Sequence, residues 1–247
     1  MAFLLTFIAG LSTLIGTIPI FINLKNEDTI ICSSLSFASG VMICVSITDL
    51  IPESINMLEK NLTGFTTIIL AFLFLVIGII LSGIISKFIP ENNYSTNNKN
   101  LYKVGIISML AIIIHNIPEG IATFISTTKS INLGLSLTLA IALHNIPEGI
   151  SISVPIYYST KSKLKAFFYT LVSALSEPLG AVITYLFLSY FINDTILGLL
   201  FSLIAGIMIE ISLTELLPTS INYNNKKLTK TFFIIGIIFM LVKFIFN

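Results

Sequence analysis

The hexapeptide HNIPEG occupies residues 115–120 and returns unchanged at residues 144–149. The chain has only two histidines, His115 and His144, and each begins one copy. Both copies lie inside long apolar runs, where hydrocarbon would surround a membrane helix. Because an ionisable side chain is costly at that depth, it marks a functional site by default. We therefore interpret the rest of the chain as the structure that holds these two segments face to face.

The composition indicates an integral membrane protein whose surroundings are the lipid bilayer. Of the 247 residues, 55% are hydrophobic and only 10% are charged, too few charges for the surface of a soluble protein of this length. The formal net charge of +1 gives no support for a nucleic-acid partner. No basic residue precedes the first apolar run, as it would in a secretory signal peptide, so we expect this run to be a permanent span.

A membrane-spanning helix needs about 20 mostly apolar residues. Eight stretches meet this requirement, so the predicted fold is all-α, a polytopic membrane protein with a single transmembrane domain over residues 1–247. The predicted spans cover about residues 2–22, 29–55, 65–89, 103–126, 131–157, 164–191, 196–221 and 229–246.

The lysines predict the orientation, because cytoplasmic loops carry an excess of positive charge. An even number of spans puts both termini on one side of the membrane. Ten of the thirteen lysines fall on the other side. We expect a multi-pass protein of the cell membrane with both termini extracytoplasmic and the polar loop between spans three and four, residues 91–100, in the cytoplasm.

The first three spans resemble the last three. Gly40-Val41-Met42 in span two aligns with Gly206-Ile207-Met208 in span seven, and Asp49 then falls on Glu215. Shorter matches pair span one with span six, span three with span eight, and span four with span five. In span one, Leu11-Ser12 and Gly16 align with Leu175-Ser176 and Gly180 of span six. By the lysine topology the paired spans run in opposite directions. The pattern predicts an inverted 3+2+3 repeat about an axis in the membrane plane, a plan found in secondary transporters.

Helical geometry brings the polar residues of each hexapeptide together. Residues four apart lie on one helix face, so His115 and Glu119 point the same way, as do His144 and Glu148. The asparagine after each histidine lies about 100° around the helix. The proline of each copy frees the carbonyl four residues earlier and predicts a bend.

Seven acidic residues fall within the predicted spans, and no lysine lies near the middle of any span. An ionised carboxylate costs roughly 2.5–3.5 kcal/mol or more at the bilayer centre, so these acids must be protonated, hydrated or compensated by a cation. Imidazole, carboxylate and amide oxygen suit Zn²⁺ and neighbouring first-row divalent ions. The predicted metal ligands, enough for one ion or two, are His115, Asn116, Glu119, His144, Asn145, Glu148 and Glu177.

Five further residues are candidates for a transport pathway: Met42, Asp49, Glu53, Glu210 and Glu215. Asp49, Glu53 and Glu215 lie near span ends, where interfacial solvation explains a carboxylate as well as ion handling does. Glu210 lies deeper, which favours a place in a cavity. Met42 offers a thioether but is more simply explained as core filler. A protonated glutamate beside a proline also has a structural explanation, since it can hydrogen-bond the freed carbonyl.

The sequence resembles the Zrt/Irt-like (ZIP) metal transporters, and their broad-specificity bacterial branch most of all. The resemblance rests on the two hexapeptides, on Ser176-Glu177-Pro178-Leu179-Gly180 in span six and on eight spans with outside termini, and it covers essentially the whole chain. It implies transport of Zn²⁺, and often of Fe²⁺, Mn²⁺, Co²⁺ or Cd²⁺, toward the cytoplasm by alternating access. The metal is then the substrate, no cofactor or enzymatic activity is expected, and homodimers are usual.

The resemblance also implies a binuclear centre. One ion would use His115, Glu119, His144 and Glu148, and the other would use Asn116, Asn145 and Glu177 with the shared glutamates. Spans one, four, five and six would move as a unit against spans two, three, seven and eight. The cytoplasmic loop contains no histidine, unlike that of many eukaryotic members, so a metal-sensing loop is absent or works differently.

Two other functions compete with metal transport. A proton- or cation-coupled carrier of an organic solute would explain the buried acids, but the two His-Asn pairs would then lack a purpose. An intramembrane metalloenzyme would use the same cluster, but a zinc protease has His-Glu-x-x-His with the glutamate as general base. Here asparagine follows each histidine.

Overall fold

The structure is a computed structural model that describes residues 1–22, 26–88, 99–188, 193–223 and 226–242. Within these residues every regular element is a helix, which confirms the all-α prediction. The predicted loop at residues 91–100 falls mostly outside the described residues, as do the ends predicted for spans three, six and eight.

Each predicted span overlaps one or more helices of the described residues. Span one is α1 (Ala2–Ser12) and the 3₁₀ segment η1 (Thr13–Phe21), span three is α4 (Phe65–Phe88), span four is α5 (Lys99–Lys129), and span five is α6 (Ile131–Thr160). Span two is α2 (Glu27–Val45), η2 (Ser46–Leu50) and α3 (Ile51–Glu59). Span six is α7 (Lys163–Ala174), α8 (Ser176–Ile183) and η3 (Thr184–Leu188). Span seven is α9 (Asp194–Ile211), η4 (Ser212–Leu216) and α10 (Leu217–Asn222), and span eight begins as α11 (Lys226–Leu241).

Seven of these stretches are long and apolar enough to cross a membrane. They confirm a polytopic membrane protein: Ala2–Phe21, Glu27–Glu59, Phe65–Phe88, Leu101–Lys129, Ile131–Thr160, Lys163–Phe187 and Asp194–Asn222. The eighth predicted span is described only as far as residue 242, so the count of eight stays a prediction.

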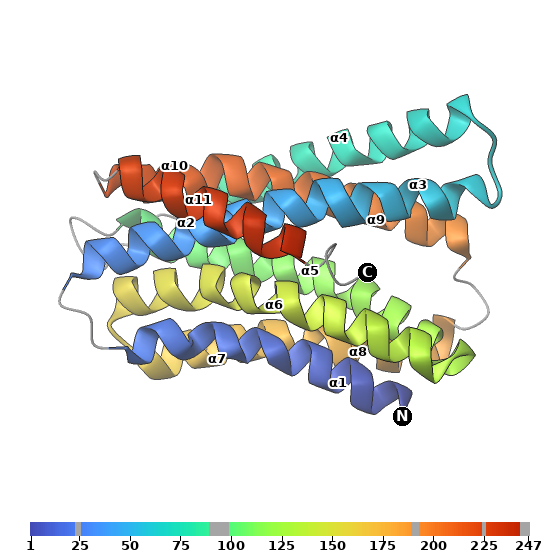
Figure 1. Cartoon of the computed structure of the whole chain (residues 1–247), viewed down its shortest axis with the longest axis horizontal. Helices are drawn as coiled ribbons and strands as arrows, with labels where there is room; N and C mark the ends of the chain where they lie inside the picture. Colours follow the sequence, from blue (N-terminus) through green and yellow to red (C-terminus); the bar gives the residue numbers. More distant parts are fainter. Residues whose placement is uncertain (23–25, 89–98, 189–192, 224–225, 243–247) are drawn as a thin grey trace.

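The helices form two bundles (Figure 1). In the first, called here the α5/α6 bundle, α5 packs along α6, and α1, η1, α7 and α8 pack around this pair. In the second, the α2/α9 bundle, α2 packs along α11 and α4 along α9. The contact between the bundles is made mainly by α2 against α6. The same division separates spans one, four, five and six from spans two, three, seven and eight.

Close glycine contacts repeat between the two halves of the α2/α9 bundle. A methyl group on Gly40 of α2 would lie 2.2 Å from the carbonyl oxygen of Phe233 on α11. A methyl group on Gly206 of α9 would lie 2.0 Å from the carbonyl oxygen of Leu75 on α4. The α2–α11 pair therefore packs in the same way as the α9–α4 pair, and the matched helices run in opposite directions (Figure 1). Both observations agree with the inverted repeat.

The repeat extends to an irregularity that the sequence pattern did not predict. The segments Ser46–Leu50 and Ser212–Leu216 are π-helical turns, and a proline follows each of them two residues later. Proline lacks an N–H group and its ring crowds the carbonyl four residues earlier. Widening the helix by one residue at that point relieves the conflict without ending the span.

Candidate metal centre

The two hexapeptides meet at the centre of the α5/α6 bundle. His115, Asn116 and Glu119 come from α5, and His144, Asn145 and Glu148 come from α6, which both remain helical through their prolines. The seventh residue, Glu177, comes from the first turn of α8. All seven residues are buried, and none has more than 7% of its total surface exposed.

Glycine places α8 against this centre. A methyl group on Gly120 of α5 would lie 1.9 Å from the carbonyl oxygen of Glu177, so the two backbones touch. Only a residue without a side chain permits this approach. The final glycine of the hexapeptide thus brings Glu177 beside Glu119.

The histidines and glutamates converge across the α5–α6 contact. Nε2 of His115 lies 3.2 Å from Oε1 of Glu119 and 3.3 Å from Oε1 of Glu148. Nε2 of His144 lies 2.8 Å from the same Oε1 of Glu119. The carboxylate of Glu119 is therefore shared between both imidazoles.

The spacing fits a metal ion. A ring nitrogen of His115, one of His144 and a carboxylate oxygen of Glu148 all lie within 4.8 Å of one another. The ligand atoms around a tetrahedral Zn²⁺ lie about 3.4 Å apart, given bonds of about 2.0–2.1 Å. Small side-chain rotations would bring the three atoms to that separation.

The asparagines use their nitrogen atoms for anchoring. Nδ2 of Asn145 donates to Oε2 of Glu177 at 2.9 Å and to the carbonyl oxygen of Ala9 at 3.0 Å. Nδ2 of Asn116 donates to the carbonyl oxygen of Ser173 at 3.3 Å. Within the described residues, Oδ1 of Asn116 and Oδ1 of Asn145 have no hydrogen-bond partner, so both amide oxygens are available to bind a metal.

Buried atoms without partners are concentrated at this centre. Among the described residues, both carboxylate oxygens of Glu148, Oε2 of Glu119, Oε1 of Glu177 and both ring nitrogens of His115 lack hydrogen bonds. Such groups are rare in native proteins because each one carries a desolvation penalty. The ion pairs of these carboxylates in the described part of the chain are with the histidines. A cation would satisfy several of these atoms at once.

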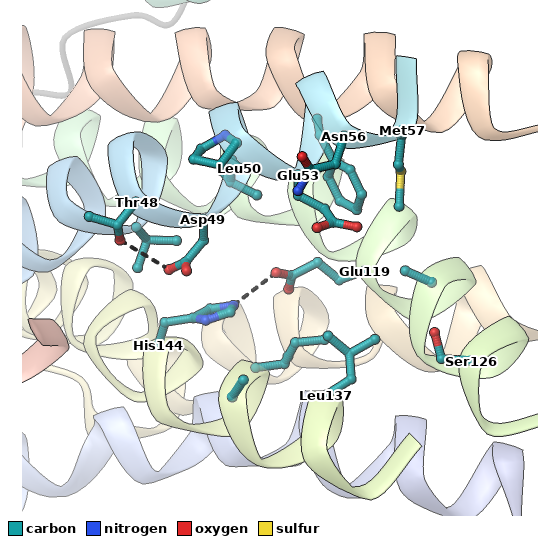
Figure 2. A pocket seen from close by; sticks show the side chains of 16 residues that line it. Thr48, Asp49, Leu50, Glu53, Asn56, Met57, Glu119, Ser126, Leu137 and His144 are labelled. Atoms are coloured by element: carbon teal, nitrogen blue, oxygen red, sulfur yellow. Dashed lines mark hydrogen bonds and ion pairs between the residues drawn. The ribbon is translucent and has the colours of Figure 1, made fainter. Parts of the chain in front are cut away.

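A cavity of about 390 Å³ leads from this centre to one end of the bundles. Glu119 and His144 line this cavity, with Asp49 and Glu53 of the η2–α3 segment across from them (Figure 2). In Figure 1, α3 and the N-terminus lie at the same end of the molecule. The structure thus joins two of the predicted pathway residues to the predicted metal ligands.

The other three pathway candidates lie elsewhere. Met42 is fully buried in the apolar core, which agrees with its interpretation as core filler. Glu210 accepts hydrogen bonds from Ser82 and Thr214, and neither Glu210 nor Glu215 lines the cavity. Between α4, α5 and α9 there is a void of only about 10 Å³, lined mainly by isoleucines.

The sequence pattern missed several polar residues of the cavity wall: Thr48, Asn56 and Ser126. The hydroxyl of Thr48 donates to the carbonyl oxygen of Cys44 at 2.9 Å and lies 3.4 Å from a carboxylate oxygen of Asp49. Its position beside Asp49 was the available signal, but a threonine near a span end is too common to be singled out.

Comparisons with known proteins agree with this geometry. A protein-family model described as ZIP Zinc transporter matches residues 90–243. The "Zinc transporter ZupT" of Clostridium perfringens is 41% identical over 98% of this chain and 94% of its own length. The proteins of the same name from Streptococcus mutans and Oceanobacillus iheyensis are 42% and 39% identical, each over 98% of this chain and over 95% and 96% of their own lengths.

Proposed function

This chain belongs to the ZIP family of zinc transporters, and from that membership we propose that it carries Zn²⁺ toward the cytoplasm by alternating access. It is a multi-pass membrane protein that transports divalent metal ions. The observation that carries the proposal is the buried group of His115, His144 and Glu148, whose ligand atoms lie within 4.8 Å of one another. Fe²⁺, Mn²⁺, Co²⁺ and Cd²⁺ are further candidate substrates, because the same ligand types suit them.

The proposed centre has two halves. His115, Glu119, His144 and Glu148 hold one ion, and the oxygens of Asn116, Asn145 and Glu177 hold a second with help from the shared glutamates. The short separations between His115, Glu119 and Glu148 support the first half. The hydrogen bond from Asn145 to Glu177 and the unpaired amide oxygens support the second.

The cavity suggests the route. A metal ion would approach past Asp49 and Glu53, reach Glu119 and His144, and leave past Glu210 and Glu215 when the centre opens to the other side. Asp49 and Glu215 occupy equivalent places in the two halves of the repeat, which is what alternating access through an inverted repeat requires. With the termini extracytoplasmic, as the lysines predict, the cavity faces the outside of the cell.

Several accompanying properties complete the proposal. The chain acts as a single transmembrane domain of the cell membrane, works as a homodimer and needs no resident cofactor. It is not an enzyme, because the ligand set leaves no separate general base. Every imidazole and carboxylate at the centre has a place in binding the transported ion.

The proposal is tested by metal uptake into proteoliposomes. We expect the purified protein to take up Zn²⁺ and at least one other divalent ion at about pH 7.5, and more slowly at about pH 5.5, because protons compete with the metal for imidazole and carboxylate. The His115→Ala variant and protein-free liposomes are the controls. Uptake by the His115→Ala variant at the wild-type rate would exclude the proposed centre, and absence of uptake of any divalent metal would exclude the function.

The route makes a separate prediction at Asp49. Replacing Asp49 by asparagine removes one negative charge from the cavity wall and lowers the local concentration of cations. We expect the metal concentration for half-maximal uptake to rise about three- to tenfold, with the maximal rate nearly unchanged. Initial rates measured over a range of metal concentrations check this. The matched control is Glu59→Gln, an exposed charge on α3 that does not line the cavity. Equal effects of both substitutions would contradict the route.

A further inference from the structure

The α5/α6 bundle has an internal two-fold symmetry at the level of single hydrogen bonds. The hydroxyl of Ser12 donates to the carbonyl oxygen of Ala9, and the hydroxyl of Ser176 donates to that of Ser173, both at 2.6 Å. The carbonyl oxygen of Ala9 also accepts a hydrogen bond from Nδ2 of Asn145 on α6. The carbonyl oxygen of Ser173 accepts one from Nδ2 of Asn116 on α5. Ala9 therefore corresponds to Ser173, and Ser12 corresponds to Ser176.

The glycine contacts follow the same correspondence. A methyl group on Gly16 would lie 2.5 Å from the carbonyl oxygen of Ile146, and one on Gly180 would lie 2.1 Å from that of Ile117. The last residue of each hexapeptide is equally matched. A methyl group on Gly149 would lie 1.9 Å from the carbonyl oxygen of Thr13, just as one on Gly120 would lie 1.9 Å from that of Glu177.

These contacts identify Thr13 as the counterpart of Glu177. Every other polar residue of the centre has a chemically identical partner, since each hexapeptide supplies one histidine, one asparagine and one glutamate. At Thr13 the symmetry is broken, because a neutral threonine occupies the chain position that corresponds to Glu177. The metal centre is therefore electrostatically unequal in its two halves.

The environment of Thr13 suits a ligand. Its side chain is fully buried, and Oγ1 has no hydrogen-bond partner within the described part of the chain. Its backbone touches Gly149, the residue after Glu148, and neither carboxylate oxygen of Glu148 has a described hydrogen-bond partner. Threonines in helices commonly bond the carbonyl three or four residues earlier, as Thr17 does with Leu14. The hydroxyl of Thr13 does not make that bond.

We propose that Thr13 is a specificity-determining residue of the metal centre, whose hydroxyl supplies a neutral oxygen ligand in the place opposite Glu177. This inference rests on the proposed function. With threonine at position 13, the centre has three carboxylates, those of Glu119, Glu148 and Glu177. Three carboxylates hold a dication less tightly than four, which favours its release on the other side of the membrane. A hydroxyl oxygen is also a hard donor, so it helps Mn²⁺ more than it helps Zn²⁺.

Three substitutions of similar volume separate the contributions of Thr13. Thr13→Val removes the oxygen, Thr13→Ser keeps it, and Thr13→Asp adds the missing charge. For Thr13→Val we expect the dissociation constant for Mn²⁺ to rise about tenfold and that for Zn²⁺ to rise less, with Thr13→Ser within about twofold of wild type. For Thr13→Asp we expect tighter binding and slower uptake.

Equilibrium binding of both metals to purified protein and their uptake into proteoliposomes provide the measurements. A merely structural role would lower both affinities equally and would not change the ratio between Mn²⁺ and Zn²⁺. If Thr13→Val keeps the wild-type affinities while His115→Ala loses binding, this inference is wrong and the proposed function stands. If wild-type protein binds neither metal, the proposed function itself fails. Should Thr13→Asp not insert, the valine and serine variants still decide the question.

Discussion

Replacing Glu119 by alanine is expected to reduce metal uptake more than about 100-fold, since removing even groups that only orient metal ligands costs about 10- to 100-fold. One carboxylate oxygen of Glu119 lies 3.2 Å from His115 and 2.8 Å from His144. Its loss removes the bridging ligand and leaves two buried imidazoles without their shared acceptor. Uptake and equilibrium metal binding by the same purified variant check the prediction.

The control for this variant is Glu59→Ala, which removes an exposed glutamate from the end of α3. Both variants should insert and elute as the wild-type protein does on gel filtration, and only Glu119→Ala should lose uptake. Wild-type uptake by a correctly inserted Glu119→Ala protein would mean that the conducting site lies elsewhere.

Replacing Gly120 by alanine should cause the largest structural effect. The added methyl group would lie 1.9 Å from the carbonyl oxygen of Glu177, which belongs to backbone and cannot rotate away. Overpacking typically costs about 1–3 kcal/mol, and here α8 must move away from α5 and carry Glu177 with it. We expect a lower melting temperature in detergent and at least a tenfold loss of uptake, equivalent to about 1.4 kcal/mol or more.

Gly83→Ala is the matched control, because the methyl group added there would meet its nearest neighbour, an oxygen of Glu210, at 3.7 Å. Its melting temperature should stay close to wild type. Gly149→Ala, the symmetry-related change, should behave like Gly120→Ala, since it would bring a methyl group equally close to the backbone of Thr13. Equal stability of all three variants would contradict the packing described for the centre.

Most of the fold and the convergence of the predicted ligands were accessible from the sequence because both depend on local regularities. Apolar length alone identifies the spans. Helical periodicity alone puts His115 with Glu119 and His144 with Glu148, and the structure brings both pairs to one buried point. The repeated motif supplied the remaining step, because two identical polar segments in adjacent spans have a common reason to meet.

The features that sequence reasoning missed depend on contacts between distant segments. The hydrogen bond from Asn145 to Glu177 joins α6 to α8, and the one from Ser82 to Glu210 joins α4 to α9. Neither leaves a periodic signal in the chain. An inverted repeat places acidic residues on both sides of the centre. The sequence pattern therefore could not show that the cavity lies on the side of Asp49.

The position of a bound ion decides whether the buried histidines and glutamates form the metal centre. Crystals of the protein grown with Zn²⁺ or Cd²⁺ can be measured for anomalous scattering from the metal. We predict a strong peak among His115, His144 and Glu148, within about 2.0–2.3 Å of their ligand atoms, and no peak there for Glu119→Ala. A map with these side chains directed away from one another and no metal among them would contradict it.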